Sequence, residues 1–205
     1  MILDKRIYLA SRSPRRRELL AQIGIGFEML LLRDDAARGQ DVDESSLPGE
    51  NPHDYVRRVC HAKAEVGLLR VQQRRLPHFP VLAADTAVVL NDRIMGKPAN
   101  RDEAMEMLLA LSGKRHEVLT AVAVAHAGRI EQKLSASIVQ FGKLNDHAVR
   151  RYAMTGESLD KAGAYAIQGH AAAFIEKIEG SYSGVMGLPL YETAELLAMF
   201  GIEVI

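Results

Sequence analysis

Near its start the chain reads Ile7-Tyr-Leu-Ala-Ser-Arg-Ser-Pro-Arg-Arg-Arg17, and this stretch indicates the fold class. The run from Ile7 to Ala10 is short and apolar, as expected of a first strand. Ser13 and Pro14 follow it, and a serine N-cap with proline at the first helical position is a typical helix start. Gly24 ends that helix. A strand, a turn and a helix in this order favour an α/β fold.

The rest of the chain continues this alternation of elements. Arg33 to Asn51 is rich in Asp, Glu, Gly, Ser and Pro, which predicts a surface loop. We expect one domain over residues 1–205, with a central mixed sheet flanked by helices. Helices are predicted over Pro52–Gln73, Arg101–Leu111, Asn145–Met154 and around Thr193–Phe200, and strands over Val81–Leu90, Arg93–Gly96, Val118–Ala125, Gln132–Phe141 and Ala172–Ile178.

The overall charge limits the classes of partner. Among 205 residues, Lys and Arg total 26 and Asp and Glu total 26, so the formal net charge is zero. A protein that coats nucleic acid normally carries a clear basic excess. Aromatic residues make up only 5%, which leaves few platforms for base stacking and disfavours an RNA-binding module. Polyanion chemistry must then be local, in one basic site for a small phosphorylated ligand.

Two features favour a cytoplasmic protein without a membrane partner. The segment Met1–Arg6 already holds three charged residues, so we expect no secretory signal, and no apolar run approaches the ~20 residues that span a bilayer. Cys60 is the only cysteine, which excludes an intrachain disulfide. We interpret Cys60 as a buried small hydrophobe rather than a nucleophile, because free cysteine is among the most buried residue types.

Three arginines, Arg15, Arg16 and Arg17, occupy the first turn of the helix predicted after Ser13. A helix N-terminus carries partial positive charge, so each cation there costs roughly a few tenths of a kcal/mol. A bound anion reverses that cost, because free backbone N–H groups and guanidinium groups then converge on it. The Ser11-x-Ser13 lead-in favours a phosphate site over a solvated basic patch. A glycine-rich Walker loop is absent from the sequence, so a P-loop enzyme is excluded.

Asp85 and Thr86 interrupt the most apolar segment of the chain, Val-Leu-Ala-Ala-Asp-Thr-Ala-Val-Val-Leu (81–90). A carboxylate in a buried strand must be paired, metal-bound or neutralised, because an isolated buried charge is very costly. A salt bridge to a neighbouring arginine is one explanation. Perturbed carboxylates concentrate at functional sites, however. We therefore interpret Asp85 as a candidate ligand of Mg²⁺ that orients water.

Other polar residues are weaker candidates on their own. Lys97, in Gly96-Lys97-Pro98, follows the Asp85 strand closely enough to be a phosphate contact, although a surface lysine is the default. Gln168 is an uncharged donor and acceptor of the kind that reads a nucleobase edge, with a plain loop hydrogen bond as the alternative. The seven histidines show no metal-ligand spacing, and we expect them in solvated or core-edge positions.

Several short segments occur together in one order. They are Ala10-Ser-Arg-Ser-Pro-Arg-Arg16, Asp41-Val-Asp-Glu44, His61-Ala-Lys63-Ala, Ala84-Asp85-Thr86, Gly96-Lys97-Pro98, Leu159-Asp-Lys-Ala-Gly-Ala-Tyr165 with Gln168-Gly169, and Gly187-Leu-Pro189. In this combination they resemble the Maf family of nucleoside triphosphate pyrophosphatases, over nearly the whole chain. The resemblance implies a Maf and inosine-triphosphatase-like architecture, in which two lobes share one cleft.

The resemblance also implies a reaction. Water attacks the α-phosphorus of a nucleoside triphosphate and releases the monophosphate and pyrophosphate, with a divalent cation, Mg²⁺ or Mn²⁺. By that likeness Asp85 is the catalytic carboxylate, as general base or metal ligand, and Glu44 is a metal or water partner. The substrate-binding set that the likeness implies is Ser11, Ser13, Arg15, Arg16, Lys63, Thr86, Lys97 and Gln168, whose cationic members offset the triphosphate charge.

Three positions resemble substrate markers of the family, and this chain has Arg15, Thr86 and Gln168 there. The combination is similar to the branch that acts on dTTP and UTP, whereas the branch acting on 7-methyl-GTP typically has Trp, Gln and Glu. A glutamine amide can pair with the O and N–H edge of uracil or thymine. The likeness implies house-cleaning hydrolysis that keeps such nucleotides, modified pyrimidines included, out of nucleic acids.

Two alternatives remain beside this interpretation. One is a pyrophosphatase for another nucleotide, such as 7-methyl-GTP. The other is a nucleotide-binding regulator of cell division or septum formation, the phenotype from which the family takes its name. A homodimer is the family expectation, and it is also the commonest symmetric assembly.

Overall fold

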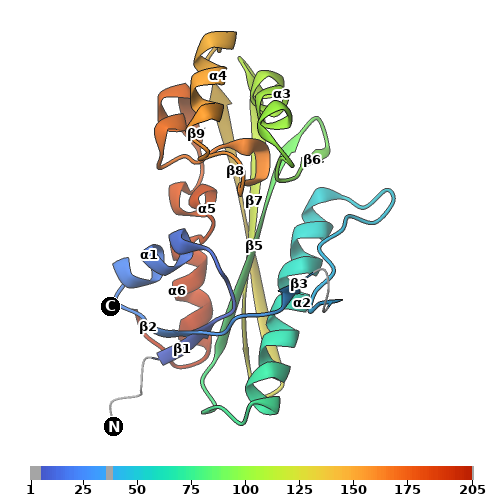
Figure 1. Cartoon of the computed structure of the whole chain (residues 1–205). Coiled ribbons are helices and arrows are strands. Elements are labelled where there is room, and N and C mark those ends of the chain that lie inside the picture. Colours follow the sequence, from blue (N-terminus) through green and yellow to red (C-terminus); the bar gives the residue numbers. More distant parts are fainter. Residues whose placement is uncertain (1–5, 36–38, 205) are drawn as a thin grey trace.

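Seven strands form one mixed β-sheet through the middle of the molecule (Figure 1). This computed structural model describes residues 6–35 and 39–204. The strands of the sheet are β1 (Arg6–Leu9), β2 (Gly26–Met29), β5 (Val81–Leu90), β6 (Arg93–Met95), β7 (Arg115–His126), β8 (Arg129–Phe141) and β9 (Ile175–Glu179). Their order is β2-β1-β5-β7-β8-β9, with β6 paired to the far end of β5.

The sheet is parallel at one edge and antiparallel elsewhere. β1 pairs in parallel with β2 and β5, and β5, β7, β8 and β9 pair successively in antiparallel fashion. A second, two-stranded sheet consists of β3 (Asp34–Asp35) and β4 (Gly39–Gln40). The predicted α/β class with a central mixed sheet is confirmed. The division into two lobes stays a prediction.

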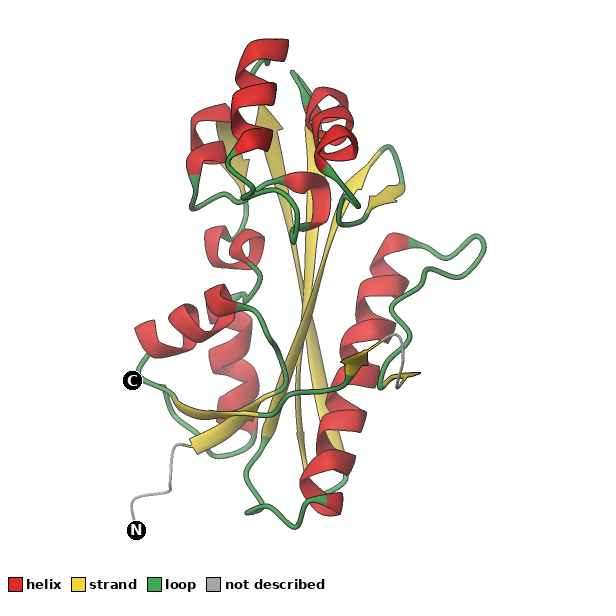
Figure 2. Cartoon of the chain, in the orientation of Figure 1, coloured by secondary structure: helices red, strands yellow, loops and turns green. Residues whose placement is uncertain are grey.

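Helices cover both faces of the sheet, with α2 on one side of the long strands and α1 and α6 on the other (Figure 2). The helices are α1 (Pro14–Gln22), α2 (Pro52–Gln73), α3 (Arg101–Leu111), α4 (Asp146–Met154), α5 (Tyr182–Met186) and α6 (Leu190–Met199), with 3-10 turns η1 (Ala162–Ala164) and η2 (His170–Phe174). Among the described residues, no helix has the length and apolar character that crossing a bilayer requires.

Strand β5 is buried on both faces, which explains its continuous apolar sequence. Ala83 and Ala87 belong to the core cluster beneath α2, whereas Leu82 and Ala84 belong to the cluster beneath α1 and α6. Side chains alternate between the two faces along a strand. Asp85 therefore points towards α2 and Thr86 towards the opposite face of the sheet. These two adjacent residues thus face different helices.

The predicted elements are largely confirmed, and one is partly wrong. α2 and β5 have their predicted bounds, and Asn91-Asp92 forms a tight turn between β5 and β6, with positive φ at both residues. Within the predicted strand Ala172–Ile178, however, residues up to Phe174 belong to η2 and only the remainder is strand. Consecutive alanines favour a helical turn over a strand, which accounts for the difference.

The segment Arg33–Asn51 lies on the surface as predicted, but ion pairs tie it to α2. The Asp41 carboxylate, whose side chain is 3% exposed, accepts hydrogen bonds from Arg70 and Arg33. These bonds, those of Arg70 above all, lower the pKa of Asp41 to about 2. Residues 36–38 of this segment, and Met1–Lys5 of the segment considered for a secretory signal, lie outside the described residues.

At Gly67, α2 packs closely on β5. A Cβ at Gly67 would lie 2.7 Å from Cγ1 of Val81. We expect Gly67→Ala to lower the free energy of unfolding by about 1–3 kcal/mol through overpacking, measured by urea denaturation. In a Val81→Ala background, Gly67→Ala should lower the free energy of unfolding by a smaller amount. Helix propensity alone predicts the opposite, a gain of about 1 kcal/mol, and such a gain would contradict this packing.

The ion pairs of Asp41 with Arg33 and Arg70 should make the stability of the protein depend on pH. Because its pKa is about 2 when folded and 3.8 in a model peptide, its contribution to stability is complete above about pH 4. That contribution is lost as the pH falls from about 4 to about 2. The difference in free energy of unfolding between the unaltered protein and Asp41→Asn should therefore shrink over this interval. A difference that stays constant from pH 5 to pH 2.5 would show that the ion pairs of Asp41 contribute nothing.

Candidate active site

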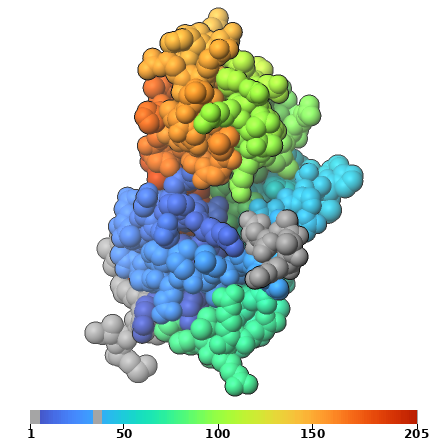
Figure 3. Space-filling model, in the orientation of Figure 1, coloured from blue at the N-terminus to red at the C-terminus, as the bar shows by residue number. Residues whose placement is uncertain are grey.

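A cavity of about 540 Å³ opens beside the middle of β5. On the face seen in Figure 3, the blue N-terminal segment meets the orange and yellow-green segments across the middle of the molecule. All ten residues assigned to the site from the sequence line this cavity: Ser11, Ser13, Arg15, Arg16, Glu44, Lys63, Asp85, Thr86, Lys97 and Gln168. Residues up to 157 positions apart in the chain are thus brought to one place.

Basic side chains outnumber acidic ones around the cavity. Its basic residues are Arg12, Arg15, Arg16, Arg33, Lys63, Lys97 and Lys161, and its acidic residues are Glu44, Asp85 and Asp160. The chain as a whole has no net formal charge, so the positive excess is a local property of this cavity. A concave site of one sign of charge attracts and concentrates ligands of the opposite sign. The cavity is therefore suited to a polyanion.

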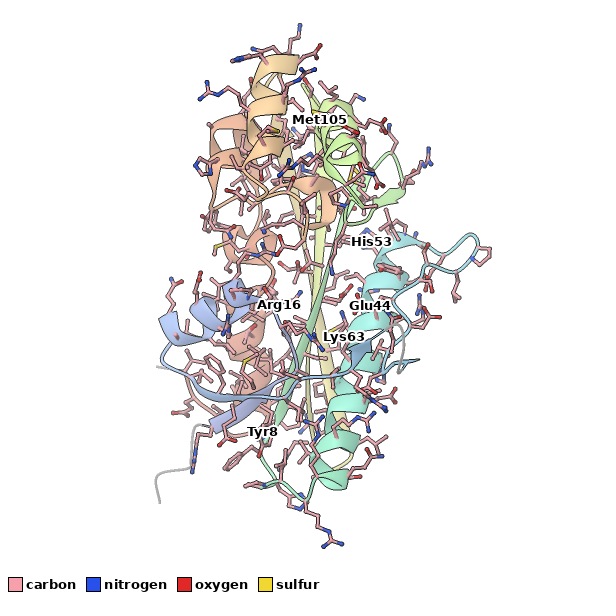
Figure 4. All side chains as sticks on the ribbon, viewed as in Figure 1. Tyr8, Arg16, Glu44, His53, Lys63 and Met105 are labelled. Carbon is pink, nitrogen blue, oxygen red and sulfur yellow. The ribbon has the colours of Figure 1, made fainter. Side chains whose placement is uncertain are left out.

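Lys63 lies between two carboxylates at the centre of the cavity. Its Nζ donates to Oδ1 of Asp85 at 2.7 Å and lies 2.8 Å from Oε1 of Glu44. Figure 4 shows Lys63 on α2 and Glu44 above it, with Arg16 facing them from the α1 side. Burial alone lowers the pKa of Lys63, but Asp85 and Glu44 outweigh it and raise that pKa. The ammonium therefore stays charged and neutralises the buried Asp85.

Asp85 and Glu44 fit a divalent cation that is shared with a phosphate ligand. Both carboxylates approach one ammonium, so their oxygens lie close to the same point. No group of three or more His, Cys, Asp or Glu side chains able to hold a metal occurs within residues 6–35 and 39–204. Mg²⁺ is typically held by one or two carboxylates together with substrate phosphates rather than by a complete protein cage. The donor set here matches that arrangement.

Two α2 residues that the sequence analysis missed hold Glu44 in place. The Tyr55 hydroxyl donates to the Glu44 carbonyl at 2.9 Å. The Arg58 guanidinium donates to both carboxylate oxygens of Glu50, at 2.6 and 2.8 Å, and to the Ser45 carbonyl at 2.9 Å. Both side chains belong to the same helix as Lys63. Their spacing of three residues, one helical turn, was a signal in the sequence that could have identified them.

The structure separates the roles of the two neighbouring arginines. Arg16 donates to the carbonyls of Gly187 and Ala84, at 2.7 and 2.8 Å, and to the hydroxyls of Ser11 and Thr86, both at 3.1 Å. A guanidinium has five N–H donors, so only one remains for a ligand. Arg15 lines the cavity and donates no hydrogen bond to any residue that the structure describes. Arg15 is thus the arginine available to bind.

The N-terminus of α1 also faces the cavity with free donors. Ser13 is the N-cap, as predicted, but its side chain makes no capping hydrogen bond, and the first turn holds no acidic residue. Its backbone N–H donates to the Ser11 hydroxyl at 3.2 Å. The backbone N–H groups of the first turn therefore remain available for an anion. Arg17, the third arginine of this turn, is exposed and lies outside the cavity lining.

Gln168 and Lys97 reach the cavity from the segment before η2 and from the loop after β6. Both side chains are exposed and line it. The Gly163 N–H donates to the Gly96 carbonyl at 3.0 Å, which joins the segment of Gln168 to that of Lys97. Gly163 has φ of +67°, and a Cβ there would lie 2.8 Å from Val88, so this close approach requires glycine.

His116 corrects one expectation from the sequence. It is 3% exposed rather than solvated or at the edge of the core, and its Nε2 lies 2.8 Å from the hydroxyl of Tyr165. Its ring packs edge-on against Phe141 and Tyr165, because this position on β7 faces the interior. Burial lowers the pKa of His116 to about 4, so the imidazole is neutral at pH 7. The prediction that Cys60 is buried is confirmed.

The cavity also has an apolar wall. Val88, Ile94, Met95, Val118 and Ile167 line it near Gln168 and Lys97. Ligand sites typically combine such apolar walls with a few oriented polar groups. The cavity is therefore suited to a ligand with a polyanionic end and a flat, partly apolar end.

Comparisons with known proteins find relatives along nearly the whole chain. The family model described as Maf-like protein matches residues 6–200. A dTTP/UTP pyrophosphatase of Nitrosomonas europaea is 56% identical over 97% of this chain and 96% of the relative. A dTTP/UTP pyrophosphatase of Aromatoleum aromaticum is 54% identical over 97% of each chain. The solved structure of the Staphylococcus aureus Ham1 protein aligns with a TM-score of 0.44 and 15% identity, covering 69% of this chain and 72% of that chain.

The matched region includes every residue of the site, from Ser11 to Gln168. The positively charged cavity, the Lys63 contacts with Asp85 and Glu44, and the extent of the match over nearly the whole sequence lead to one assignment. The chain belongs to the Maf family.

Proposed function

We propose that this protein hydrolyses dTTP and UTP to the nucleoside monophosphate and pyrophosphate. The observation that carries the proposal is the excess of basic side chains in a cavity that also holds a buried carboxylate, Asp85. A triphosphate supplies the negative charge that this cavity lacks. The names of the relatives that are more than half identical to this chain support dTTP and UTP as the substrates.

In this proposal the triphosphate binds between α1 and Lys97. Arg15, with unused guanidinium donors, contributes charge, and the N-terminus of α1 contributes backbone N–H groups. Preorganised donors of this kind stabilise the charge that develops on phosphoryl oxygens in the transition state. Lys97 also lines the cavity, where it can neutralise another part of the same chain of phosphates.

Asp85 is the proposed catalytic carboxylate. Lys63 engages its Oδ1, and the side chain is 9% exposed, so it meets the cavity without being solvated. There it accepts a proton from the attacking water, or would hold a divalent cation together with Glu44. Such a cation, Mg²⁺ or Mn²⁺, would supply charge neutralisation for the phosphates. Water adds to the α-phosphorus as pyrophosphate leaves, so one P–O bond forms and one breaks.

Gln168 is the proposed reader of the base. Its amide presents a donor and an acceptor, which match the O and N–H edge shared by uracil and thymine. The apolar wall with Val88 and Met95 lies on the same side of the cavity. The Gln168 side chain therefore suits both uracil and thymine and does not distinguish between them, as activity on dTTP and UTP requires.

Asp85→Asn tests the catalytic role. The substitution keeps the shape of the side chain but removes the charge, so pyrophosphate release from dTTP should fall by about 100-fold or more. Binding of a non-hydrolysable UTP analogue, measured by calorimetry, should persist. Asp92→Asn, in the exposed turn after β5, is the matched control and should keep its activity. If the unaltered protein binds nucleotide without releasing pyrophosphate, a regulatory role replaces the enzymatic one.

A panel of nucleoside triphosphates tests the substrate. With Mg²⁺ or Mn²⁺, dTTP and UTP should be hydrolysed faster than 7-methyl-GTP. Gln168→Glu removes the amide donor and should lower kcat/KM for dTTP by about 10-fold or more, since a site that hydrogen-bonds a substrate group discriminates strongly when that bond is lost. Gln72→Glu, at the exposed end of α2, controls for the added charge. Equal or faster turnover of 7-methyl-GTP would refute the assignment to pyrimidine nucleotides.

A further inference from the structure

The hydroxyls of Thr86 and Thr120 lie in contact next to the guanidinium of Arg16. Oγ1 of Thr120 is 3.0 Å from Oγ1 of Thr86 and 2.8 Å from the Gly184 carbonyl oxygen. Thr120 has no exposed surface and does not line the cavity, whereas Thr86 does. A substitution at Thr120 can therefore affect a ligand only through its neighbours.

The Thr120 hydroxyl is the donor in both of its hydrogen bonds. A threonine hydroxyl has one proton, and a carbonyl can only accept. That proton is therefore shared between the Gly184 carbonyl at 2.8 Å and Oγ1 of Thr86 at 3.0 Å. Thr86 in turn accepts from Nη2 of Arg16 at 3.1 Å. These contacts link Arg16, Thr86, Thr120 and Gly184 in one chain.

The same chain closes into a ring. Nε of Arg16 donates to the carbonyl of Gly187 at 2.7 Å, and the Gly187 N–H donates to the carbonyl of Gly184 at 2.9 Å. The guanidinium is thus held from two sides by the turn at the end of α5. Its Nη1 donates to Ser11, beside the N-terminus of α1, and to Ala84, next to Asp85. The orientation of Arg16 therefore sets the phosphate-binding end relative to the catalytic carboxylate.

We infer that Thr120 is a positioning residue for the hydrolysis, acting through Thr86 and Arg16. Its hydroxyl orients the hydrogen-bond ring that fixes Arg16 between α1, β5 and α5. This inference rests on the proposed function for its kinetic consequences, but its structural part does not.

The test uses variants that differ only in the hydroxyl. Thr120→Val and Thr86→Val keep the branched shape and lose the proton, while Thr120→Ser keeps the hydroxyl. Thr193→Val is the matched control, because Thr193 is equally buried and donates to the Pro189 carbonyl without contacting the ring. Thermal unfolding measures the stability of each variant. The exchange rate of the Arg16 Nε proton, followed by NMR in the ligand-free protein, reports the ring directly.

We expect Thr120→Val and Thr86→Val each to speed exchange of the Arg16 Nε proton and to lower kcat/KM for dTTP by about 10-fold, mostly in kcat. The double variant should be little worse than either single variant, because both break one ring. Thr120→Ser should restore kcat/KM to within about two-fold of the unaltered protein, and Thr193→Val should lose stability but not activity.

Three results would overturn the inference. One is unchanged Arg16 proton exchange in Thr120→Val. Another is full activity in Thr120→Val together with a loss in Thr86→Val, which would make Thr86 a direct substrate contact. The third is an equal loss of activity in Thr193→Val, which would show a general effect of stability. If the unaltered protein releases no pyrophosphate from dTTP, the proposed function fails, while the exchange measurement still decides whether the ring exists.

Discussion

One ammonium between two carboxylates determines how the site is built. Lys63 comes from α2, Asp85 from β5 and Glu44 from the segment that precedes α2, and the Lys63 ammonium lies within 2.8 Å of both carboxylates. A carboxylate in the middle of a buried strand is stable only when it is paired. The helix must therefore pack tightly on the strand. Gly67, one turn beyond Lys63, allows that approach, since a Cβ there would clash with Val81.

The other cationic side chains of the cavity fall into two groups, one that holds the protein together and one that is available for a ligand. Arg16 uses four of its five donors on the protein, so it joins α1, β5 and α5 and is mainly structural. Arg15 and Lys97 face the same cavity with their donors unused by the described residues. Arg58 and Tyr55 hold the segment of Glu44. The rigid part of the site is thus supported by buried groups, and the free cations are left for the phosphates.

The sequence predicted what local patterns determine. The bounds of α2, α3 and β5 are encoded by patterns of neighbouring residues, and the structure has them as predicted. The distinction between Arg15 and Arg16 was not predictable, because it depends on carbonyls of Ala84 and Gly187, which are distant in the chain. The burial of His116 likewise depends on packing against Phe141 and Tyr165.

The central claim is that this cavity directs water to the α-phosphorus of a pyrimidine nucleoside triphosphate. Hydrolysis of dTTP in water enriched in oxygen-18, followed by mass spectrometry of the products, tests that claim most directly. The account predicts one heavy oxygen in the nucleoside monophosphate and none in the pyrophosphate from a single turnover. Heavy oxygen in the pyrophosphate, or release of dTDP and inorganic phosphate, would contradict it.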